Sequence, residues 1–374
     1  MVGIMENRIN KITIKSFRGV KDLVLDDINR INVLVGDNNS GKTSFLECIK
    51  LISNPTLSNA VSMCTTRVKQ IRPGSFFTEF INMLPKGKNG SGIDISCEFD
   101  SGNKINYSLN GNVVQTLINP NEFKDNILRS LLSANALQQN INQFNGKINF
   151  ELYEEGNSEC KKIDQEIKLN AFNAMDYRIV RKKQEYVKVT YISPVDYAGI
   201  NSTFGFIVRN DKYKEIVIEA LKIFDPHIQD ILYIPDDLGQ TIEYVKNSVI
   251  GNIPLSCYGD GVKKLLSLAG GIASANNGIL LIDEFETALH IKNYDDVFNF
   301  VDKASKQFNV QLFITTHSKE AIDKLLEIDS LVENSEINFI TLRKDYELNR
   351  TISRTLPASI VREDRKNIDF EVRI

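Results

Sequence analysis

An apolar run that enters a glycine-rich turn constrains this chain more than any other feature. The segment reads VLVGDNNSGKTSFLECI, residues 33–49, and its turn fits the pattern G-x-x-x-x-G-K-[ST] from Gly36 to Thr43. The apolar run before the turn predicts a buried strand, and the apolar residues between Phe45 and Ile52 fall at helical spacing. A turn of this pattern between a strand and a helix predicts a phosphate-binding loop.

The residue types of the turn suit a bound triphosphate. Glycines let the backbone wrap so that successive N–H groups point at phosphate oxygens. Lys42 supplies a positive charge for the β- and γ-phosphates, and Thr43 offers its hydroxyl to Mg²⁺. The plainer alternative is a glycine-rich turn with an exposed lysine. ATP and Mg²⁺ are the expected ligands, and the candidate nucleotide-binding residues are Gly36, Asn38, Asn39, Ser40, Gly41, Lys42, Thr43 and Ser44.

A second apolar run ends in two acids. In GILLIDE, residues 278–284, four apolar residues precede Asp283 and Glu284. A buried strand can place Asp283 near the Mg²⁺ that Thr43 also binds, and Glu284 can polarise the attacking water. The pair could instead only cap the end of the strand. Together with the loop, it predicts a metal ligand in Asp283 and a catalytic base in Glu284.

A histidine follows a third predicted strand. FITTHS, residues 313–318, contains His317, one of three histidines in the chain. At the end of a strand beside the phosphate site, His317 could hydrogen-bond the γ-phosphate and respond to hydrolysis. An ordinary histidine at a strand end, bonded to its neighbours, explains the same pattern.

Strands that alternate with helices predict the fold class. After residue 189 each predicted strand ends in polar residues and is followed by a helical pattern, which is typical of an α/β sheet with its ligands along one edge. We expect three segments: an N-terminal lobe over 1–119, an inserted arm over 120–188 and a C-terminal lobe over 189–374. The arm is rich in Asn and Gln, yet FKDNILRSLLSANAL, residues 123–137, predicts a helix.

Composition excludes some classes of protein. The net charge is −3, so no global basicity indicates nucleic-acid binding. Five cysteines lie far apart without a C-x-x-C pair, and no export segment is evident, which favours reduced thiols in a cytoplasmic protein. No apolar run approaches the roughly 20 residues that span a bilayer, so no membrane association is expected. No heptad run predicts a long coiled coil.

Taken together, these motifs resemble the heads of ABC-type ATPases. Roughly 240 residues separate Thr43 from Asp283, a split similar to that of SMC and recombination-mediator heads and of the OLD (overcoming lysogenisation defect) family. PLSCYGDGVKKLLSLAGGI, residues 254–272, resembles the OLD form of the ABC signature. LLIDEFETALH followed by FITTHS resembles the Walker B, D-loop and switch histidine of the same family. The resemblance implies a two-lobed P-loop head with a mostly parallel central sheet and an antiparallel β-subdomain, into which a helical arm is inserted.

This resemblance also implies a site made by two copies. The corner of Gly259, Asp260 and Gly261 occupies the signature position at the start of a helix, where free N–H groups can meet a γ-phosphate. In ABC-type heads this motif acts across a dimer, so a homodimer around two ATP molecules is implied. Three positions depart from the family pattern. Gly259 stands where the signature serine is expected, unless Ser256 takes that role, and Asp260 stands where the first signature glycine is expected. His290 stands where the D-loop acid is expected. These departures favour a slow, switch-like ATPase.

The resemblance to OLD-family proteins also concerns partners. A metal-binding Toprim nuclease domain follows the ATPase in OLD-family nucleases, and none is expected in the roughly thirty residues after the last predicted strand. The resemblance therefore implies a separate effector protein, a nuclease or toxin, as in two-gene anti-phage systems. The protein could also form a homo-oligomer larger than a dimer.

Other classes and contacts stay open or are disfavoured. A recombination-mediator-like, ATP-dependent DNA clamp is the main alternative, and Arg18 in SFRG could touch nucleotide or be a surface arginine. A transporter subunit needs an intact signature, and a GTPase needs an N-K-x-D motif that is absent. One basic cluster could contact a phosphate backbone, although a solvated helix face is the more usual meaning of such a run: Arg178, Arg181, Lys182 and Lys183.

Overall fold

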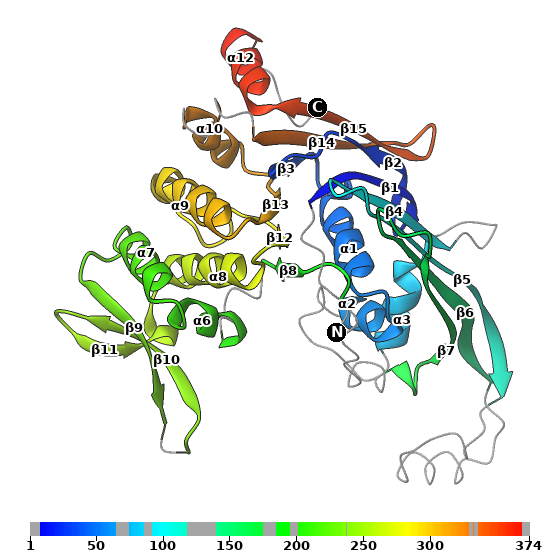
Figure 1. Cartoon of the computed structure of the whole chain (residues 1–374), viewed down its shortest axis with the longest axis horizontal. Helices are drawn as coiled ribbons and strands as arrows, with labels where there is room; N and C mark the ends of the chain where they lie inside the picture. The colour runs from blue at the N-terminus through cyan, green and yellow to red at the C-terminus, as the bar shows by residue number, and fades with distance from the viewer. Residues whose placement is uncertain are drawn as a thin grey trace. The chain divides into compact units, whose positions relative to one another are not determined.

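The computed structural model (Figure 1) describes residues 8–64, 75–85, 92–117, 140–174, 185–194, 201–236, 238–328, 332 and 336–368. The chain forms two compact units, each assembled from separate stretches of sequence. The first unit comprises Met1–Asn10, Leu25–Leu46 and Val187–Ile374, and the second comprises Lys11–Val24 and Glu47–Tyr186.

A six-stranded sheet forms the centre of the first unit. Its order is β15-β14-β3-β13-β12-β8, and all of these strands are parallel except β15, which pairs antiparallel with β14. Every residue of β3, β12 and β13 is buried, as expected for parallel strands covered on both faces. The strands are β3 (Ile31–Val35), β8 (Val189–Ile192), β12 (Ile279–Ile282), β13 (Gln311–Thr315), β14 (Ile337–Asp345) and β15 (Arg350–Pro357).

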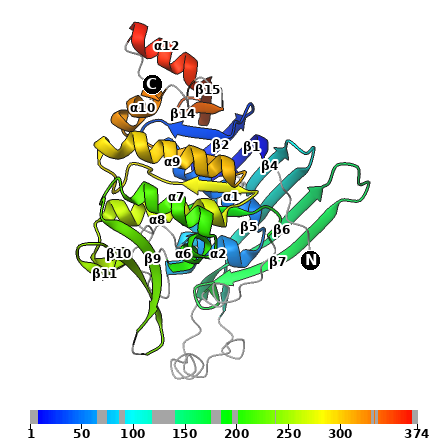
Figure 2. The same cartoon turned by 60° about the vertical axis from the view of Figure 1, so that its left-hand side comes forward.

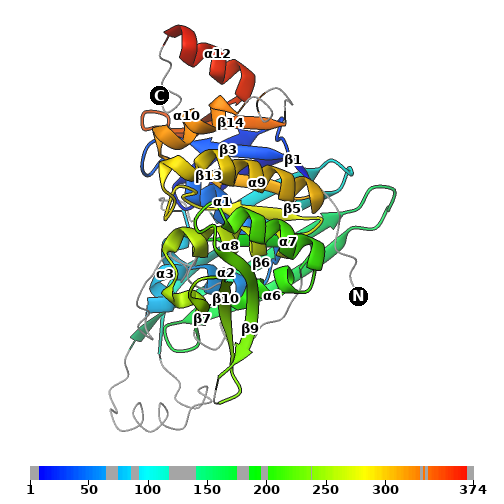
Figure 3. The same cartoon turned by 90° about the vertical axis from the view of Figure 1, so that its left-hand side faces the viewer.

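Helices follow the strands of the first unit in alternation, so the predicted α/β fold is confirmed. Figures 2 and 3 show α7, α8 and α9 side by side on one side of the sheet, and these helices contact one another. Ser318 begins α10 by accepting a hydrogen bond from the Ala321 N–H at 3.1 Å, a side-chain cap. The helices are α6 (Asn201–Val208), α7 (Asp211–Leu221), α8 (Asp260–Ser274), α9 (Tyr294–Gln307), α10 (Lys319–Glu327) and α12 (Ala358–Ile368).

A three-stranded antiparallel sheet precedes α8 in the chain. Its order is β11-β10-β9, with β9 at Ile228–Pro235, β10 at Thr241–Asn247 and β11 at Gly251–Pro254. After β11 the chain makes one 3₁₀ turn, η3 (Leu255–Cys257), and enters α8 at Gly259. The small sheet is therefore connected through η3 to the amino end of α8.

The second unit is built on another six-stranded sheet, of order β2-β1-β4-β5-β6-β7. Burial alternates along β4, so one face of that strand packs inward. Helix α1 (Lys42–Ser53) belongs to the first unit up to Leu46 and to the second from Glu47. The strands are β1 (Ile9–Phe17), β2 (Val20–Leu25), β4 (Ile93–Phe99), β5 (Lys104–Leu117), β6 (Asn140–Tyr153) and β7 (Lys161–Asn170), and the remaining helices are α2 (Leu57–Cys64) and α3 (Ser75–Met83).

The helical arm expected over 120–188 is not confirmed. Its described parts contain β6 and β7, and β6 pairs with β5 over 14 residues, from Leu117↔Asn140 to Lys104↔Tyr153. The reason is visible in β6, where Ile148, Phe150 and Leu152 alternate with polar residues and are buried. The sheet thus crosses the predicted boundary at 119/120. The helix predicted over 123–137 lies outside the described residues.

Two simpler expectations concern thiols and membranes. The five cysteines are free thiols, and burial raises the pKa of the Cys64 thiol to about 12. None of the described helices has the length and apolar content that crossing a bilayer requires.

Candidate nucleotide-binding site

The loop from Gly36 to Thr43 joins the carboxyl end of β3 to the amino end of α1. Gly36, Asn39 and Gly41 have φ angles of 139°, 67° and 108°, so the backbone turns through conformations that favour glycine and asparagine. A Cβ at Gly36 would stand 2.3 Å from the carbonyl oxygen of Leu342, which excludes any side chain there. Sequence and backbone agree on a tightly wrapped loop.

Lys42 lies across this loop. Its Nζ donates hydrogen bonds to the carbonyl oxygens of Gly36 at 2.6 Å and of Asp37 at 2.8 Å. The side chain is 8% exposed, whereas Asp37, Asn38 and Asn39 at the tip of the loop are exposed. The ammonium is therefore held within the loop. The alternative of an exposed lysine would require it to extend into solvent, and it does not.

Asp283 follows the last residue of β12 and is 4% exposed. Three hydroxyl groups donate to its carboxylate: Thr43 Oγ1 at 3.1 Å, Thr315 Oγ1 at 2.6 Å and Tyr191 OH at 3.1 Å. Parallel β3, β13, β12 and β8 bring these groups to one edge of the sheet, because their carboxyl ends meet there.

The Thr43 hydroxyl and the Asp283 carboxylate fit a magnesium ion chemically. Mg²⁺ takes hard oxygen ligands, and in nucleotide sites it uses one or two protein oxygens together with phosphate oxygens and water. Among the described residues no cluster of three His, Cys, Asp or Glu side chains could hold a metal by itself. A site of this composition would therefore depend on the nucleotide for its remaining ligands.

Glu284 has a left-handed backbone, with φ at 50°. Its N–H donates to Thr315 Oγ1 at 2.9 Å, and its Oε2 accepts from Thr287 Oγ1 at 3.4 Å. A non-glycine residue in this conformation costs energy and persists only where its surroundings hold it. Thr315 thus contacts both acids, through Asp283 Oδ1 and through the Glu284 N–H.

His317 lies two residues beyond β13, and its contact is with Glu286. The His317 N–H donates to Glu286 Oε1 at 2.9 Å, and its Nδ1 is 3.4 Å from the same oxygen. The His317 side chain is 44% exposed. The other carboxylate oxygen of Glu286 is buried and has no hydrogen-bond partner among the described residues.

The corner at Gly259, Asp260 and Gly261 forms the amino end of α8. Gly259 is the N-cap residue, and both Gly259 and Asp260 are exposed. A Cβ at Gly261 would stand 2.6 Å from the Phe224 ring, whereas a Cβ at Gly259 would meet nothing within 4 Å. Asp260 lies 3.3 Å from the Lys263 ammonium.

Sequence reasoning missed four residues near the acids: Tyr191, Lys264, Glu286 and Thr315. Lys264 is fully buried on α8, and its Nζ lies 3.5 Å from the carbonyl oxygen of Glu284. Burial lowers the pKa of Lys264 to about 8, while the carboxylates of Glu286, Asp283 and Glu284 act in the opposite direction. A signal was available for Thr315, which ends a strand beside His317. Lys264 looks like a solvated lysine in a helical pattern.

Three other expectations concern basic residues and the D-loop position. Arg18 lies in the second unit, where its Nε is 2.9 Å from Glu47 Oε2 and its side chain is 13% exposed, so it is not a surface arginine. His290 accepts from the Lys292 N–H at 3.3 Å and caps η4 (Ile291–Asn293). The basic cluster lies outside the described residues: Arg178, Arg181, Lys182 and Lys183.

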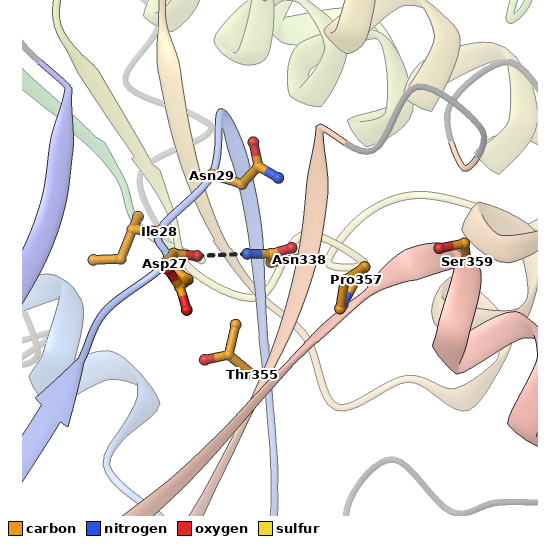
Figure 4. Close-up of a pocket in the computed structure, with 7 residues that line it drawn as sticks. All are labelled: Asp27, Ile28, Asn29, Asn338, Thr355, Pro357 and Ser359. Carbon is orange, nitrogen blue, oxygen red and sulfur yellow. Dashed lines mark hydrogen bonds between the residues drawn. The ribbon is translucent and has the colours of Figure 1, made fainter. Parts of the chain in front are cut away.

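A polar cavity of about 540 Å³ lies at the other edge of the first unit's sheet (Figure 4). There β3 and β14 begin and β15 ends, so the cavity is not part of the loop at the carboxyl end of β3. Asn338 donates from Nδ2 to the carbonyl oxygen of Asp27 at 2.6 Å across it. The cavity is lined by Asp27, Ile28, Asn29, Asn338, Thr355, Pro357 and Ser359.

A wrapped glycine loop that holds its lysine, beside an acid at the end of a neighbouring parallel strand, defines a P-loop ATPase domain. The chain belongs to the family described as "AAA domain, putative AbiEii toxin, Type IV TA system", whose pattern matches residues 31–323. That match spans the loop, the corner, both acids and His317.

Individual relatives cover most of the chain. The "ATP/GTP phosphatase" of Helicobacter pylori (strain ATCC 700392 / 26695) is 24% identical over 341 residues, which are 86% of this chain and 88% of that protein. The "DNA replication and repair protein RecF" of Francisella tularensis subsp. novicida (strain U112) is 26% identical over 367 residues, with 87% of this chain and 99% of that protein covered.

The solved structures that resemble this chain include two SMC heads. One is an SMC head bound to the C-winged helix domain of ScpA, with 12% identity, a TM-score of 0.49 and coverage of 94% of this chain and 99% of that one. Another is the SMC head domain from Thermotoga maritima, with 11% identity, a TM-score of 0.43 and coverage of 93% and 99%.

Proposed function

We propose that this protein binds ATP with Mg²⁺ and hydrolyses it to ADP and phosphate. The single observation that carries the proposal is the junction at Asp283, where Thr43 Oγ1 from the loop and Thr315 Oγ1 from β13 both donate to one carboxylate. Loop N–H groups and Lys42 hold the phosphates, and Thr43 and Asp283 hold the metal, which neutralises phosphate charge when bound. The name of the Helicobacter pylori relative supports a nucleoside triphosphatase activity.

The catalytic step that we assign to the chain is proton transfer by Glu284. The carboxylate accepts a proton from the attacking water. The left-handed backbone of Glu284 is held by the bond from its N–H to Thr315 Oγ1. Glu286 holds His317 through its backbone N–H and its ring. We assign to this imidazole the contact with the γ-phosphate. Glu286 would therefore keep the imidazole in place as phosphate leaves.

The proposed site is completed by a second copy of the chain. Gly259 and Asp260 of the corner are exposed at the amino end of a 15-residue helix, where N–H groups and the helix dipole attract anions. In a symmetric dimer each corner faces the triphosphate on the partner's loop. Asp260 carries a negative charge at this position, which lowers the affinity for phosphate and supports slow, switch-like turnover.

As in OLD-family ATPases, the proposed role of the nucleotide state is to control a separately encoded effector, a nuclease or toxin, in cytoplasmic anti-phage defence. The family description, which names a toxin and a type IV TA system, supports a role in a system encoded by two genes. The test is to co-express the chain with the products of neighbouring genes and to isolate complexes with and without ATP. A stable, nucleotide-sensitive complex that Lys42→Ala abolishes is expected. Absence of any complex, with ATPase activity intact, would remove the effector role and leave the enzyme.

A second candidate is an ATP-dependent DNA clamp. The observation that favours it is the RecF relative, which aligns over 99% of its own length. Titration of plain duplex DNA, with and without ATP, separates the two roles. ATP-dependent binding without any partner, weakening steeply with salt, would favour the clamp, and Arg178, Arg181, Lys182 and Lys183 are the first residues to neutralise.

A further inference from the structure

The helix that begins at the Gly259–Gly261 corner carries a fully buried lysine in its first turn and a half. The exposed fraction of Lys264 is 0%, and the face of α8 around it is buried with Leu265 and Leu268. A long cationic side chain is rarely buried completely unless it is paired. Methionine or leucine would fill the same space without a charge, so packing alone does not explain a lysine at this position.

The surroundings of the ammonium are unusual in a second way. Three carboxylates, those of Glu286, Asp283 and Glu284, stabilise its charge, yet among the described residues no carboxylate oxygen lies within ion-pair distance of Nζ. Its hydrogen-bond partner is the carbonyl oxygen of Glu284, at 3.5 Å. Taking an ammonium out of water costs several kcal/mol, so a position that tolerates one with only a long hydrogen bond requires a reason other than stability.

The contact of Lys264 is with the backbone of the proposed catalytic base. Glu284 is held in its left-handed conformation from both sides, with its N–H on Thr315 Oγ1 at 2.9 Å and its carbonyl oxygen 3.5 Å from Lys264 Nζ. Thr315 ends β13 in the sheet, whereas Lys264 lies on α8. A small shift of α8 would therefore lengthen or shorten the second contact and turn the peptide that carries the base.

We propose that Lys264 is a positioning residue that couples the Gly259–Gly261 corner to Glu284 of the same protomer. The inference rests on the proposed function, in which the corner binds the triphosphate held by the partner's loop. ATP on the partner then moves α8, and Lys264 sets the backbone of Glu284 at the protomer's own site. Each site thus becomes competent for hydrolysis when the other is filled, and the two sites act cooperatively.

The test measures the initial rate of phosphate release against ATP concentration for the full-length wild type and for Lys264→Met. We expect the wild type to show a Hill coefficient approaching 2, the number of coupled sites. Lys264→Met should show a Hill coefficient near 1 and a kcat lower by about tenfold or more, with ATP affinity of the loop changed by less than about threefold. Lys264→Arg, which keeps the charge and N–H donors, should restore most of the cooperativity.

Ser267→Ala is the matched control, because Ser267 is also a buried polar residue of α8 and lies about one turn from Lys264. It should keep both the Hill coefficient and kcat. Thermal unfolding is recorded for every variant. If Lys264→Met does not fold, Lys264→Gln replaces it in the assay and should likewise show a Hill coefficient near 1.

The outcomes separate this inference from the function on which it rests. A folded Lys264→Met or Lys264→Gln protein with wild-type cooperativity and kcat overturns the coupling, and so does a wild type that hydrolyses ATP with a Hill coefficient of 1. A wild type that does not hydrolyse ATP, or that does so as fast as Lys42→Ala, contradicts the proposed function itself.

Discussion

Thr43 and Asp283 are 240 residues apart in the chain and joined by a hydrogen bond of 3.1 Å from hydroxyl to carboxylate. The loop at the end of β3 and the acid at the end of β12 come together although β13 lies between their strands in the sheet. Thr315 lies at the end of β13, between these two strands, and its hydroxyl also donates to Asp283. The edge of the sheet, rather than any local segment, makes the candidate metal site.

Thr315→Val should separate positioning of the acids from nucleotide binding. The change removes the hydroxyl that donates to Asp283 at 2.6 Å and accepts from the Glu284 N–H at 2.9 Å, while the shape of the side chain stays nearly the same. We expect kcat to fall by about 10- to 100-fold and the Mg²⁺ concentration that gives half-maximal activity to rise. The free energy of unfolding should fall by about 1–3 kcal/mol, because the partners of the hydroxyl are left unpaired. Phosphate release over a Mg²⁺ titration measures both effects.

Thr316→Val is the control for that experiment. Thr316 is equally buried and adjacent, but its hydroxyl accepts from the Ser318 N–H instead of contacting either acid. If Thr316→Val lowers kcat as much as Thr315→Val, the bonds to Asp283 and Glu284 are not what matters.

Glu284→Gln should bind ATP and turn it over slowly. The amide keeps the size of the side chain but cannot accept a proton from water, so we expect a drop in kcat of about 10²-fold or more with affinity nearly unchanged. Because the triphosphate persists, dimers should accumulate, which light scattering after size exclusion measures. Normal turnover would place the base at another residue.

The two glycines of the corner should differ sharply in what they tolerate. Gly261→Ala places a Cβ 2.6 Å from the Phe224 ring and should lower the free energy of unfolding by about 1–3 kcal/mol, a cost typical of overpacking. Gly259→Ala meets nothing within 4 Å and should be nearly neutral. Chemical denaturation compares them, and Phe224→Leu should recover part of the loss in Gly261→Ala. Equal stabilities would show that the Phe224 contact is unimportant.

The sequence predicts well where local patterns and chain order suffice. The apolar run to Val35, the glycine turn and the helix from Lys42 follow from neighbouring residues, and the structure has the strand, loop and helix in that order. Asp283 is recognisable because a short, fully apolar strand precedes it. The roles assigned to these residues stay predictions.

Contacts between distant segments could not be predicted in the same way. Residues 140–170 are read as part of a helical arm because Asn and Gln obscure the alternation, yet they contain β6, which pairs with β5, and β7, which pairs with β6. Lys264 has the period of a helix residue, and only the packing of α8 shows that its exposed fraction is 0%. Tyr191 donates to Asp283 from an edge strand that no motif marks.

The central claim is that each nucleotide is held between one copy's loop and the other copy's corner, and complementation between two inactive variants tests it most directly. Lys42→Ala disables the loop. Gly259→Glu disables the corner, and because a Cβ there meets nothing within 4 Å, the protomer should still fold. A mixed dimer contains one intact site, made by the loop of the Gly259→Glu copy and the corner of the Lys42→Ala copy.

The measurement is ATP turnover of an equimolar mixture, against each variant alone. The account predicts that each variant is nearly inactive and that the mixture is clearly more active than either variant. Half of the dimers are mixed and each has one complete site, so the ceiling is about a quarter of wild-type activity. The coupling through Lys264 lowers this by about tenfold, because the other site of a mixed dimer holds no ATP. A mixture no more active than its components, or a Gly259→Glu protein that is fully active alone, would contradict the shared site.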